Sequence, residues 1–269
     1  MNRSRITSLA GPRIAFGEVA LKRYQEFPSP FGLEHLIECV WVFAPRACGG
    51  KAAIERIFPD GASDIVVSGE SAAVHGPAAS FRLISEERPI LGFRIRRGAA
   101  KAVLGFGPAD LKGVPITLGT LWGRRGRDFE SRIQAISAPV VPIELLAGFV
   151  RQRIAEVADL DIAVLAALDR IDRFPGSAIR NIASDVGLSE RHLRRRFENH
   201  VGLGIKHYAR MARFQRLLDA IRQYKRRLGV ASPGWAGLSG EHGFADQAHL
   251  IREVKTFAGL TPVELLLTL

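Results

Sequence analysis

A pattern of short helix, glycine and second helix occurs twice in the last third of this 269-residue chain, and it restricts the possible folds more than any other feature. In the first copy, residues 179–186 place apolar side chains on one face of a short helix, and Gly187 suits a tight turn with positive φ. Ser189 then caps a second helix. The apolar positions of that helix recur every four residues, at Leu193, Phe197 and Val201. The pattern predicts a helix-turn-helix unit over about residues 179–200, whose second helix would enter the major groove of DNA.

The second copy lies at about residues 235–257. Its first helix contains Leu238, its turn is formed by Gly243 and Phe244, and Asp246 is the expected cap of its second helix. The apolar positions of that second helix are Leu250, Val254 and Phe257. Between the copies, apolar residues recur at intervals of three or four: Ile205, Tyr208, Met211, Phe214, Leu217, Leu218 and Ile221. This spacing predicts one long amphipathic linker helix over about residues 205–224 that holds the two units at a fixed separation.

The positive charge of the chain is concentrated in the same region. The net charge is +11, and the stretch from Arg191 to Arg227 holds twelve Lys or Arg and two acidic residues, whereas the remaining residues hold 26 basic and 25 acidic ones. With Leu193 and Phe197 turned inward, Arg191, Arg194 and Arg195 fall on the outward side of their helix. Crowded arginines repel one another unless an anion relieves them, so the pattern favours a polyanionic partner, most simply DNA.

The N-terminal half is expected to be β-rich up to about residue 120 and helical after that. Residues 35–43 are rich in β-branched and aromatic side chains, a Pro-Asp-Gly turn precedes a short apolar strand within residues 58–69, and residues 89–98 alternate between apolar and basic. A short helix is expected after Gly98. The break near residues 159–161 divides the chain into domains 1–158 and 159–269. The expected fold class is α+β, with a β-rich N-terminal domain followed by an all-α C-terminal domain.

The C-terminal part resembles the DNA-binding domain of the AraC/XylS family of bacterial transcription regulators. The resemblance rests on "GLSERHLRRRF", "IKHYARMARFQRL" and "GFADQAHLIREVKTFAGLTP", and it covers about residues 162–269. It implies that the first recognition helix meets bases through Arg191, Arg194 and Arg195, and the second through Gln247, His249, Ile251 and Arg252. Arg and Gln can contact guanine and adenine through two hydrogen bonds each, and Ile can touch a thymine methyl group.

Other polar residues near these helices have two interpretations. His192, Arg196, Lys225, Arg226 and Arg227 are candidate phosphate contacts. Arg196 could instead meet a neighbouring acid, the basic run that ends the linker helix could complement the helix dipole, and His249 could be a capping or packing residue. Ser239 replaces a usual Ala, and Leu250 and Val254 replace usual aromatics, so the second unit is expected to be looser and to discriminate less.

The N-terminal half resembles the N-terminal domain of a subset of AraC-like regulators through "CVWVF", "FPDGASDIVV", "HGP" and "LGFRIRRGAAKAVLG". That subset would have Pro where this chain has Arg97, which puts the turn before the short helix in question. The resemblance implies a domain that senses a small-molecule effector or forms a dimer. It implies double-stranded DNA and RNA polymerase as partners, a monomer or homodimer, and no cofactor.

The sequence offers little for metal binding or catalysis. Cys39 and Cys48 are the only cysteines, with eight residues between them, which fits neither a disulfide framework nor a zinc site. His35 and His75 have no carboxylate at ligand spacing, and Asp60 sits in a turn where Asp is favoured for backbone reasons, so a metal or acid–base pair with Asp64 is not expected. Trp41 and Phe43 are expected in a core rather than in a ligand pocket.

No phosphate loop, nucleophile elbow or metalloprotease motif is present, so we do not expect an enzyme. No apolar run approaches 18 residues and no signal peptide is apparent, which favours a cytoplasmic protein without a membrane span. Two alternatives stay open. One is a small-molecule-binding protein whose helical domain mainly contacts proteins. The other is a DNA-repair enzyme fused to an AraC-like domain, which would need more cysteines than this chain has.

Overall fold

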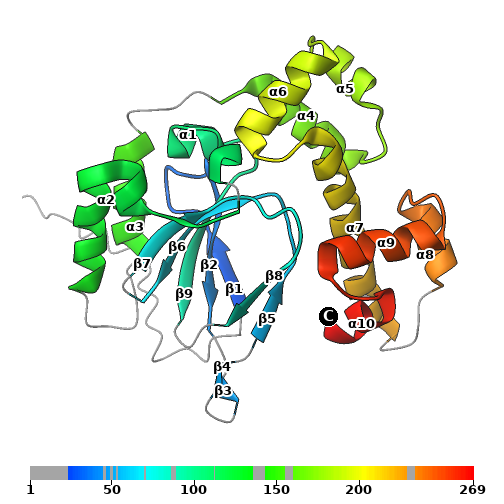
Figure 1. Ribbon diagram of the computed structural model, residues 1–269, viewed down its shortest axis with the longest axis horizontal. Coiled ribbons are helices and arrows are strands. Elements are labelled where there is room, and N and C mark those ends of the chain that lie inside the picture. The colour runs from blue at the N-terminus through cyan, green and yellow to red at the C-terminus, as the bar shows by residue number, and fades with distance from the viewer. Residues whose placement is uncertain are drawn as a thin grey trace, which may run out of the picture.

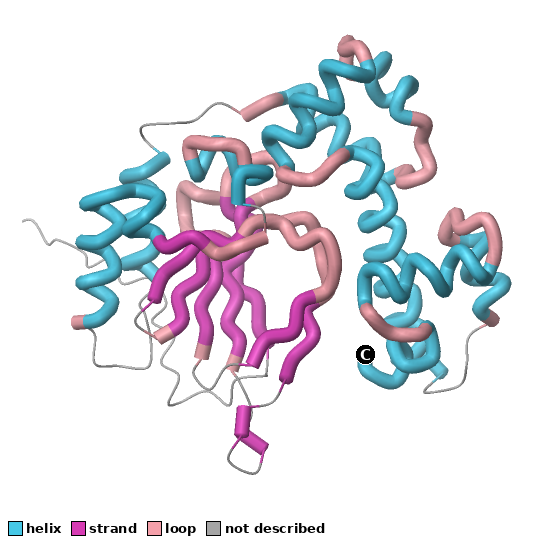
Figure 2. The backbone as a smooth tube through the Cα atoms, viewed as in Figure 1, coloured by secondary structure: helices cyan, strands magenta, loops and turns pink. Residues whose placement is uncertain are grey.

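The computed structural model describes residues 24–44, 47–48, 51–52, 54–69, 71–85, 89–111, 113–135, 143–154, 160–228 and 234–269. Figure 1 shows a sheet with helices against it, and beside them a group of helices threaded by one long helix. Figure 2 shows the same division by secondary structure, with all strands in the N-terminal part and only helices in the C-terminal part. The predicted α+β class, with a β-rich part followed by an all-helical part, is confirmed.

The N-terminal part is built on a six-stranded antiparallel sheet with strand order β1-β2-β9-β6-β7-β10. Its strands are Tyr24–Pro28 (β1), Ile37–Phe43 (β2), Ile90–Ile95 (β9), Ser63–Ser68 (β6), Ser71–His75 (β7) and Ile116–Thr117 (β10). Two further pairs are Ala47–Cys48 with Lys51–Ala52 (β3, β4) and Ile54–Ile57 with Arg82–Ser85 (β5, β8). The three strand predictions correspond to β2, β6 and β9.

Helices cover one face of this sheet, as Figure 1 shows. They are Ala100–Leu104 (α1), the short 3-10 helix Pro108–Leu111 (η1), Leu118–Gln134 (α2) and Ile143–Ile154 (α3). Val40, Phe93 and Ile65 from the sheet pack in one core with Phe129 of α2 and Leu146 of α3. Leu91, Phe93 and Ile95 are buried as the alternation predicted. The short helix expected after Gly98 is α1.

The C-terminal part contains both predicted helix-turn-helix units. Its helices are Ile162–Arg173 (α4), Ile179–Asp185 (α5), Glu190–Val201 (α6), Ile205–Leu228 (α7), Trp235–Glu241 (α8), Gln247–Ala258 (α9) and Pro262–Thr268 (α10). Gly187 has φ 68°, and the Ser189 and Asp246 side chains cap α6 and α9 by accepting the amides of His192 and His249. The first unit is α5 with α6, the second is α8 with α9, and α7 is the linker helix.

Two cores of buried residues divide the chain. The first runs from the sheet to Val150 of α3, and the second begins at Val164 of α4 and includes α5 to α10. Residues 155–159, in which the boundary between domains 1–158 and 159–269 was predicted, lie outside the described ranges.

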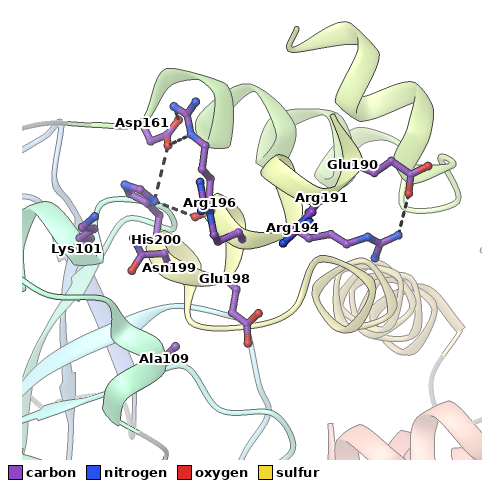
Figure 3. Close-up of a pocket in the computed structure, with 11 residues that line it drawn as sticks. Lys101, Ala109, Asp161, Glu190, Arg191, Arg194, Arg196, Glu198, Asn199 and His200 are labelled. Carbon is purple, nitrogen blue, oxygen red and sulfur yellow. Dashed lines mark hydrogen bonds and ion pairs between the residues drawn. The ribbon is translucent and has the colours of Figure 1, made fainter. Parts of the chain in front are cut away.

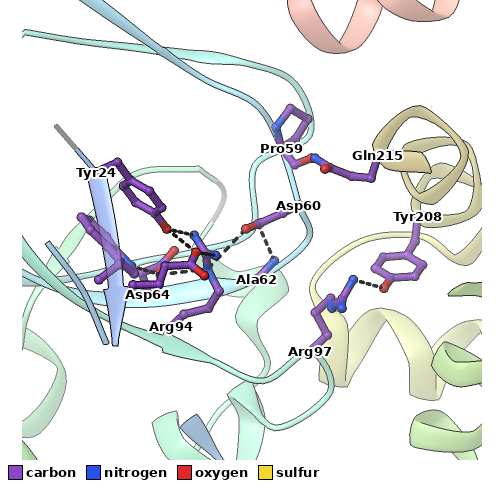
Figure 4. Close-up of polar contacts among 11 residues, drawn as sticks. Tyr24, Pro59, Asp60, Ala62, Asp64, Arg94, Arg97, Tyr208 and Gln215 are labelled. Carbon is purple, nitrogen blue, oxygen red and sulfur yellow. Dashed lines mark hydrogen bonds and ion pairs between the residues drawn. The ribbon is translucent and has the colours of Figure 1, made fainter. Parts of the chain in front are cut away.

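The two parts touch along α7, where polar contacts cross between the cores. Arg97 Nη1 donates to the Tyr208 hydroxyl at 3.2 Å, and that hydroxyl donates to Asp172 Oδ1 at 2.8 Å. Gln215 Nε2 donates to the Pro59 carbonyl at 2.5 Å (Figure 4). At Gly61, with φ 78°, an added Cβ would lie 2.6 Å from Met211 Cε, so only glycine lets this turn approach α7 so closely.

Arg97 stands where the related subset was expected to have Pro, yet the turn before α1 forms. The Ala99 amide donates to the Arg96 carbonyl at 2.9 Å, and Gly98 takes φ 85°. The departure from the pattern therefore leaves the turn intact and supplies the guanidinium that reaches Tyr208.

Replacing Tyr208 by Phe should lower the free energy of unfolding by about 1–2 kcal/mol, because the bridging hydroxyl hydrogen-bonds to two charged groups. Urea denaturation followed by circular dichroism measures this loss. In an Arg97→Ala background the same change should cost less, since one partner is already gone. An equal cost in both backgrounds would show that the hydroxyl does not couple the two parts.

Candidate nucleic-acid interface

The recognition helix α6 buries one face and exposes the other. Leu193 and Phe197 have no exposed surface and Val201 is 2% exposed, and all three pack in the C-terminal core. Arg191 and Arg195 lie exposed on the outward side, together with His192. Arg194 is half-buried, and its Nη2 donates to Glu190 Oε2 one turn earlier at 3.0 Å. Arg191 and Arg195 are thus exposed to solvent, whereas Arg194 forms an ion pair with Glu190.

The Arg196 side chain points away from this outward face and binds the residue that caps the N-terminus of α4. Its Nε and Nη2 each donate to an oxygen of Asp161 at 2.7 Å, and the same carboxylate accepts the Val164 amide at 3.1 Å as the cap of α4 (Figure 3). Of the two interpretations given by the sequence, the structure matches the neighbouring acid rather than a phosphate. Burial would raise the pKa of Asp161, but the hydrogen bonds from Arg196 and Val164 outweigh it, so the pKa lies below its ordinary value.

The second recognition helix, α9, repeats the division between a buried and an exposed face. Leu250, Val254 and Phe257 have no exposed surface. Gln247 and Arg252 are exposed, and Ile251 is half-buried.

His249 has a structural role at the start of α9. Its ring Nδ1 pairs with the Ala245 amide at 3.2 Å, so that nitrogen is the acceptor, and the ring packs edge-on against Phe244 at 5.6 Å between centroids. These contacts correspond to the capping and packing alternative that the sequence left open.

Glu253, which the sequence analysis missed, anchors α9 to the linker helix. Its carboxylate is 6% exposed and accepts three hydrogen bonds from Arg210 of α7, the shortest at 2.8 Å. The available signal was an acidic residue placed next to the apolar positions of α9, opposite an arginine of α7. Each recognition helix is therefore held on another helix by a two-pronged Arg–carboxylate pair, which fixes orientation more than it adds stability.

The remaining candidates are placed as follows. Lys225 Nζ donates to the Leu267 carbonyl at 3.4 Å, which joins the end of α7 to α10, while Arg226 and Arg227 are exposed. Ser239 is buried, and its hydroxyl donates to the Ala236 carbonyl at 2.7 Å, so the partner that a buried serine requires is present.

An open depression of about 1040 Å³ runs along the outward side of α6. Its lining includes Arg191, Arg194, Arg195 and Asn199 of α6, together with Lys101 and Ala109 of the N-terminal part (Figure 3). The surface beside the first recognition helix is thus shared by both parts of the chain.

The acidic residues of the sheet form a network with Arg94. Asp60 accepts the Ala62 amide at 3.0 Å, as expected of a turn Asp, and its Oδ2 lies 3.3 Å from Arg94 Nε. Asp64 accepts from Trp41 Nε1 at 2.7 Å, and burial raises its pKa to about 7 (Figure 4). Among the described residues, no group of three or more His, Cys, Asp or Glu could hold a metal ion.

Trp41 and Phe43 differ in their surroundings. Phe43 is buried, whereas Trp41 is half-buried and covers Gly92, where an added Cβ would lie 2.0 Å from the indole. Within the described ranges, no helix is both long enough and apolar enough to cross a membrane.

Two capped recognition helices on a common linker, each with an exposed basic or polar face, define a protein of the double helix-turn-helix class. Residues 182–267 match a family model described as a helix-turn-helix domain, and residues 25–116 match one described as a domain of unknown function. The chain therefore carries a helix-turn-helix domain of the AraC type at its C-terminus. The resemblance predicted from the motifs is confirmed.

Three solved structures similar to this chain are all of ToxT from Vibrio cholerae. One shares 12% identity over 92% of this chain and 99% of that chain, with a TM-score of 0.40. An apo variant shares 13% identity over 86% and 97%, with a TM-score of 0.44. The wild-type protein bound to an unsaturated fatty acid shares 12% identity over 86% and 91%, with a TM-score of 0.39. No curated protein matches the chain.

Replacing Asp161 by Asn should lower the unfolding free energy at neutral pH by about 1–2 kcal/mol, because the charged partner of Arg196 is lost while Asn can still cap α4. The folded-state pKa of Asp161 is lowered, so its contribution is present above the unfolded pKa of about 3.9 and is lost as pH falls through the folded value. Wild-type protein should therefore lose stability below about pH 4 more steeply than the variant.

Denaturant unfolding between pH 7 and pH 3 measures this difference. Asp169→Asn is the matched control, since Asp169 is an exposed residue of the same helix that pairs with Arg173 one turn away. Parallel pH curves for the Asp161 variant and wild type would contradict the assignment.

Proposed function

We propose that this protein binds specific DNA sequences by placing α6 and α9 in successive major grooves on one face of the duplex. The observation that carries the proposal is that α6 and α9 share the same structural features. Each is 12 residues long, is capped by a side chain, buries one apolar face and is fixed by one Arg–carboxylate pair. With α7 joining them, the two helices would read half-sites about one turn of DNA apart.

The exposed residues of the two helices are the proposed base contacts. Arg191 and Arg195 suit guanine, Gln247 suits adenine, and Arg252 suits a second guanine. Arg194 would contribute after leaving Glu190, Ile251 would touch a thymine methyl, and His249 would act through the shape of the turn. His192, Arg226 and Arg227 remain proposed phosphate contacts, which set affinity rather than sequence preference.

Control by a small-molecule effector at the N-terminal domain is part of the proposal, with RNA polymerase as a partner and the cytoplasm as the location. The support is a chain of contacts. Arg94 pairs with Asp60 in the turn whose Pro59 carbonyl and Gly61 meet Gln215 and Met211 of α7. A ligand that moved this turn would move the linker helix.

A second function, in which the helical domain mainly contacts proteins, would need no sequence preference on DNA. The exposed arginines of α6 favour the first proposal, since a protein partner would have to supply matching acids. Binding to every duplex with equal, weak and nearly salt-independent affinity would favour the second.

Replacing Arg195 by Ala should weaken binding to a cognate duplex by roughly 1–3 kcal/mol and should weaken binding to a scrambled duplex much less. The cognate duplex would be obtained by selection with the purified protein from a random 30-base-pair pool. Fluorescence anisotropy across salt concentrations measures both affinities. Wild-type protein should prefer the selected duplex at least ~10³-fold, with a steep loss of affinity as salt rises.

Arg132→Ala is the control for Arg195→Ala. It also removes one exposed arginine, but from α2, which lies away from the C-terminal helices (Figure 1). An equal loss on both duplexes would make Arg195 a phosphate contact rather than a base contact. A selection that enriches no sequence would contradict sequence-specific binding itself.

A further inference from the structure

The depression beside α6 has one wall that belongs to the N-terminal domain. Lys101 of α1 and Ala109 of η1 line it together with Arg191, Arg194 and Arg195 of α6. Figure 3 shows Lys101 near His200, towards the C-terminal end of that helix. A residue of the N-terminal domain thus stands next to the helix that reads DNA in the proposed function.

Close backbone packing holds this wall against the end of α6. At Gly202, with φ 81°, an added Cβ would lie 2.8 Å from Pro77 Cγ and 3.1 Å from the carbonyl carbon of Pro108. At Gly107 an added Cβ would lie 2.5 Å from Asn199 Oδ1. The positive φ of Gly202 and its contact with Pro77 require glycine there, and Gly107 packs directly on Asn199, so α1 and η1 have a defined position relative to the recognition helix.

The wall stands beside the outward face of α6 without covering it. Asn199, which touches Gly107, is still exposed, and so are Arg191, Arg195 and Glu198. The face that would enter the groove is therefore open, while α1 and η1 stand at its edge, near the C-terminal end of the helix. When a recognition helix enters the major groove, the phosphates of the two strands lie along its edges.

The charges along the depression favour a phosphate at this edge. Asp161 is paired with Arg196 and Glu190 with Arg194, so these two acids are neutralised within the protein. Lys101 forms no ion pair or side-chain hydrogen bond with any residue in the described part of the chain. Lys101 thus adds an ammonium to a depression lined by exposed arginines, and of the three acids that line it only Glu198 has no ion pair among the described residues. The balance of charge along the depression is positive, which favours an anion.

We propose that Lys101 binds a backbone phosphate next to the site read by α6, so that the N-terminal domain forms part of the DNA-binding surface. The proposal rests on the proposed function. Its consequence is a direct route from the N-terminal domain to DNA affinity: a shift of α1 and η1 relative to α6 removes or restores a phosphate contact without any change in the recognition helices themselves.

The first test compares the salt dependence of Lys101→Ala, Lys101→Arg and wild-type protein on the selected and scrambled duplexes. Loss of one phosphate contact should reduce the slope of log K against log salt by about 0.9 and weaken binding roughly fivefold to tenfold near 0.1 M salt, on both duplexes alike. Lys101→Arg should bind like wild type. Arg132→Ala, which removes the same charge from another part of the same domain, should leave the slope unchanged. An unchanged slope for Lys101→Ala, or an equal change for Arg132→Ala, would overturn the proposal.

The second test locates the contact on the DNA. A series of selected duplexes would each carry one neutral methylphosphonate in place of a phosphate beside the first half-site. At one position the substitution should weaken wild-type binding and have no effect on Lys101→Ala, because the contact is already absent. If every position affects both proteins equally, Lys101 makes no phosphate contact. Failure of this proposal is distinct from failure of the proposed function: Arg195→Ala would still lose affinity for the selected duplex in the first case, and wild type would show no preferred duplex in the second.

Discussion

The buried hydroxyl of Tyr208 holds three parts of the chain at one point. Tyr208 has no exposed surface, and its hydroxyl lies between Arg97 of the sheet domain and Asp172 of α4. A tyrosine in a core needs a partner for its hydroxyl, and here both partners are charged and belong to different elements. The position of α7 relative to the sheet and to α4 is therefore specified by polar geometry, whereas the surrounding apolar contacts supply most of the stability.

From α7 outward, both recognition helices are oriented by the same kind of contact. Arg196 of α6 reaches back to the cap of α4, and Glu253 of α9 is gripped by Arg210 of α7. A two-pronged guanidinium–carboxylate pair restricts rotation of a helix about its own axis, which apolar packing alone permits more easily. That restriction matters for the proposed function, in which a small rotation of α6 would turn Arg191 and Arg195 from the base edges towards the phosphates.

The parts of the molecule that follow from local pattern were predictable, and the parts that depend on distant pairing were not. The Gly187 turn, the Ser189 and Asp246 caps and the buried faces of α6 and α9 follow from spacing. Helix was predicted after about residue 120, but the break inside α2 was not: the backbone leaves helical geometry at Gly123, whose φ is 59°, and Gly126 lets the Leu118 backbone approach, where a Cβ would lie 1.9 Å from its carbonyl oxygen. Contacts such as Asp161 with Arg196, 35 residues apart, or Arg97 with Tyr208, 111 apart, leave no local signal.

The N-terminal domain touches both helix-turn-helix units as well as the helix between them. The Gly202 end of α6 rests against Pro77 and Pro108. At the second unit, Arg56 Nη1 donates to the Ala258 carbonyl at 2.8 Å, and the Phe81 amide donates to the Phe257 carbonyl at 3.0 Å. Phe257 also stacks on Phe214, with 5.3 Å between the ring centroids. These contacts hold the second unit in place, although Leu250 and Val254 in its core led us to expect looser packing. The separation of the two reading helices is therefore set by the whole chain rather than by α7 alone. If the protein binds DNA as we propose, a change within the sheet domain would alter the half-site spacing that it accepts, because both units rest on the same body.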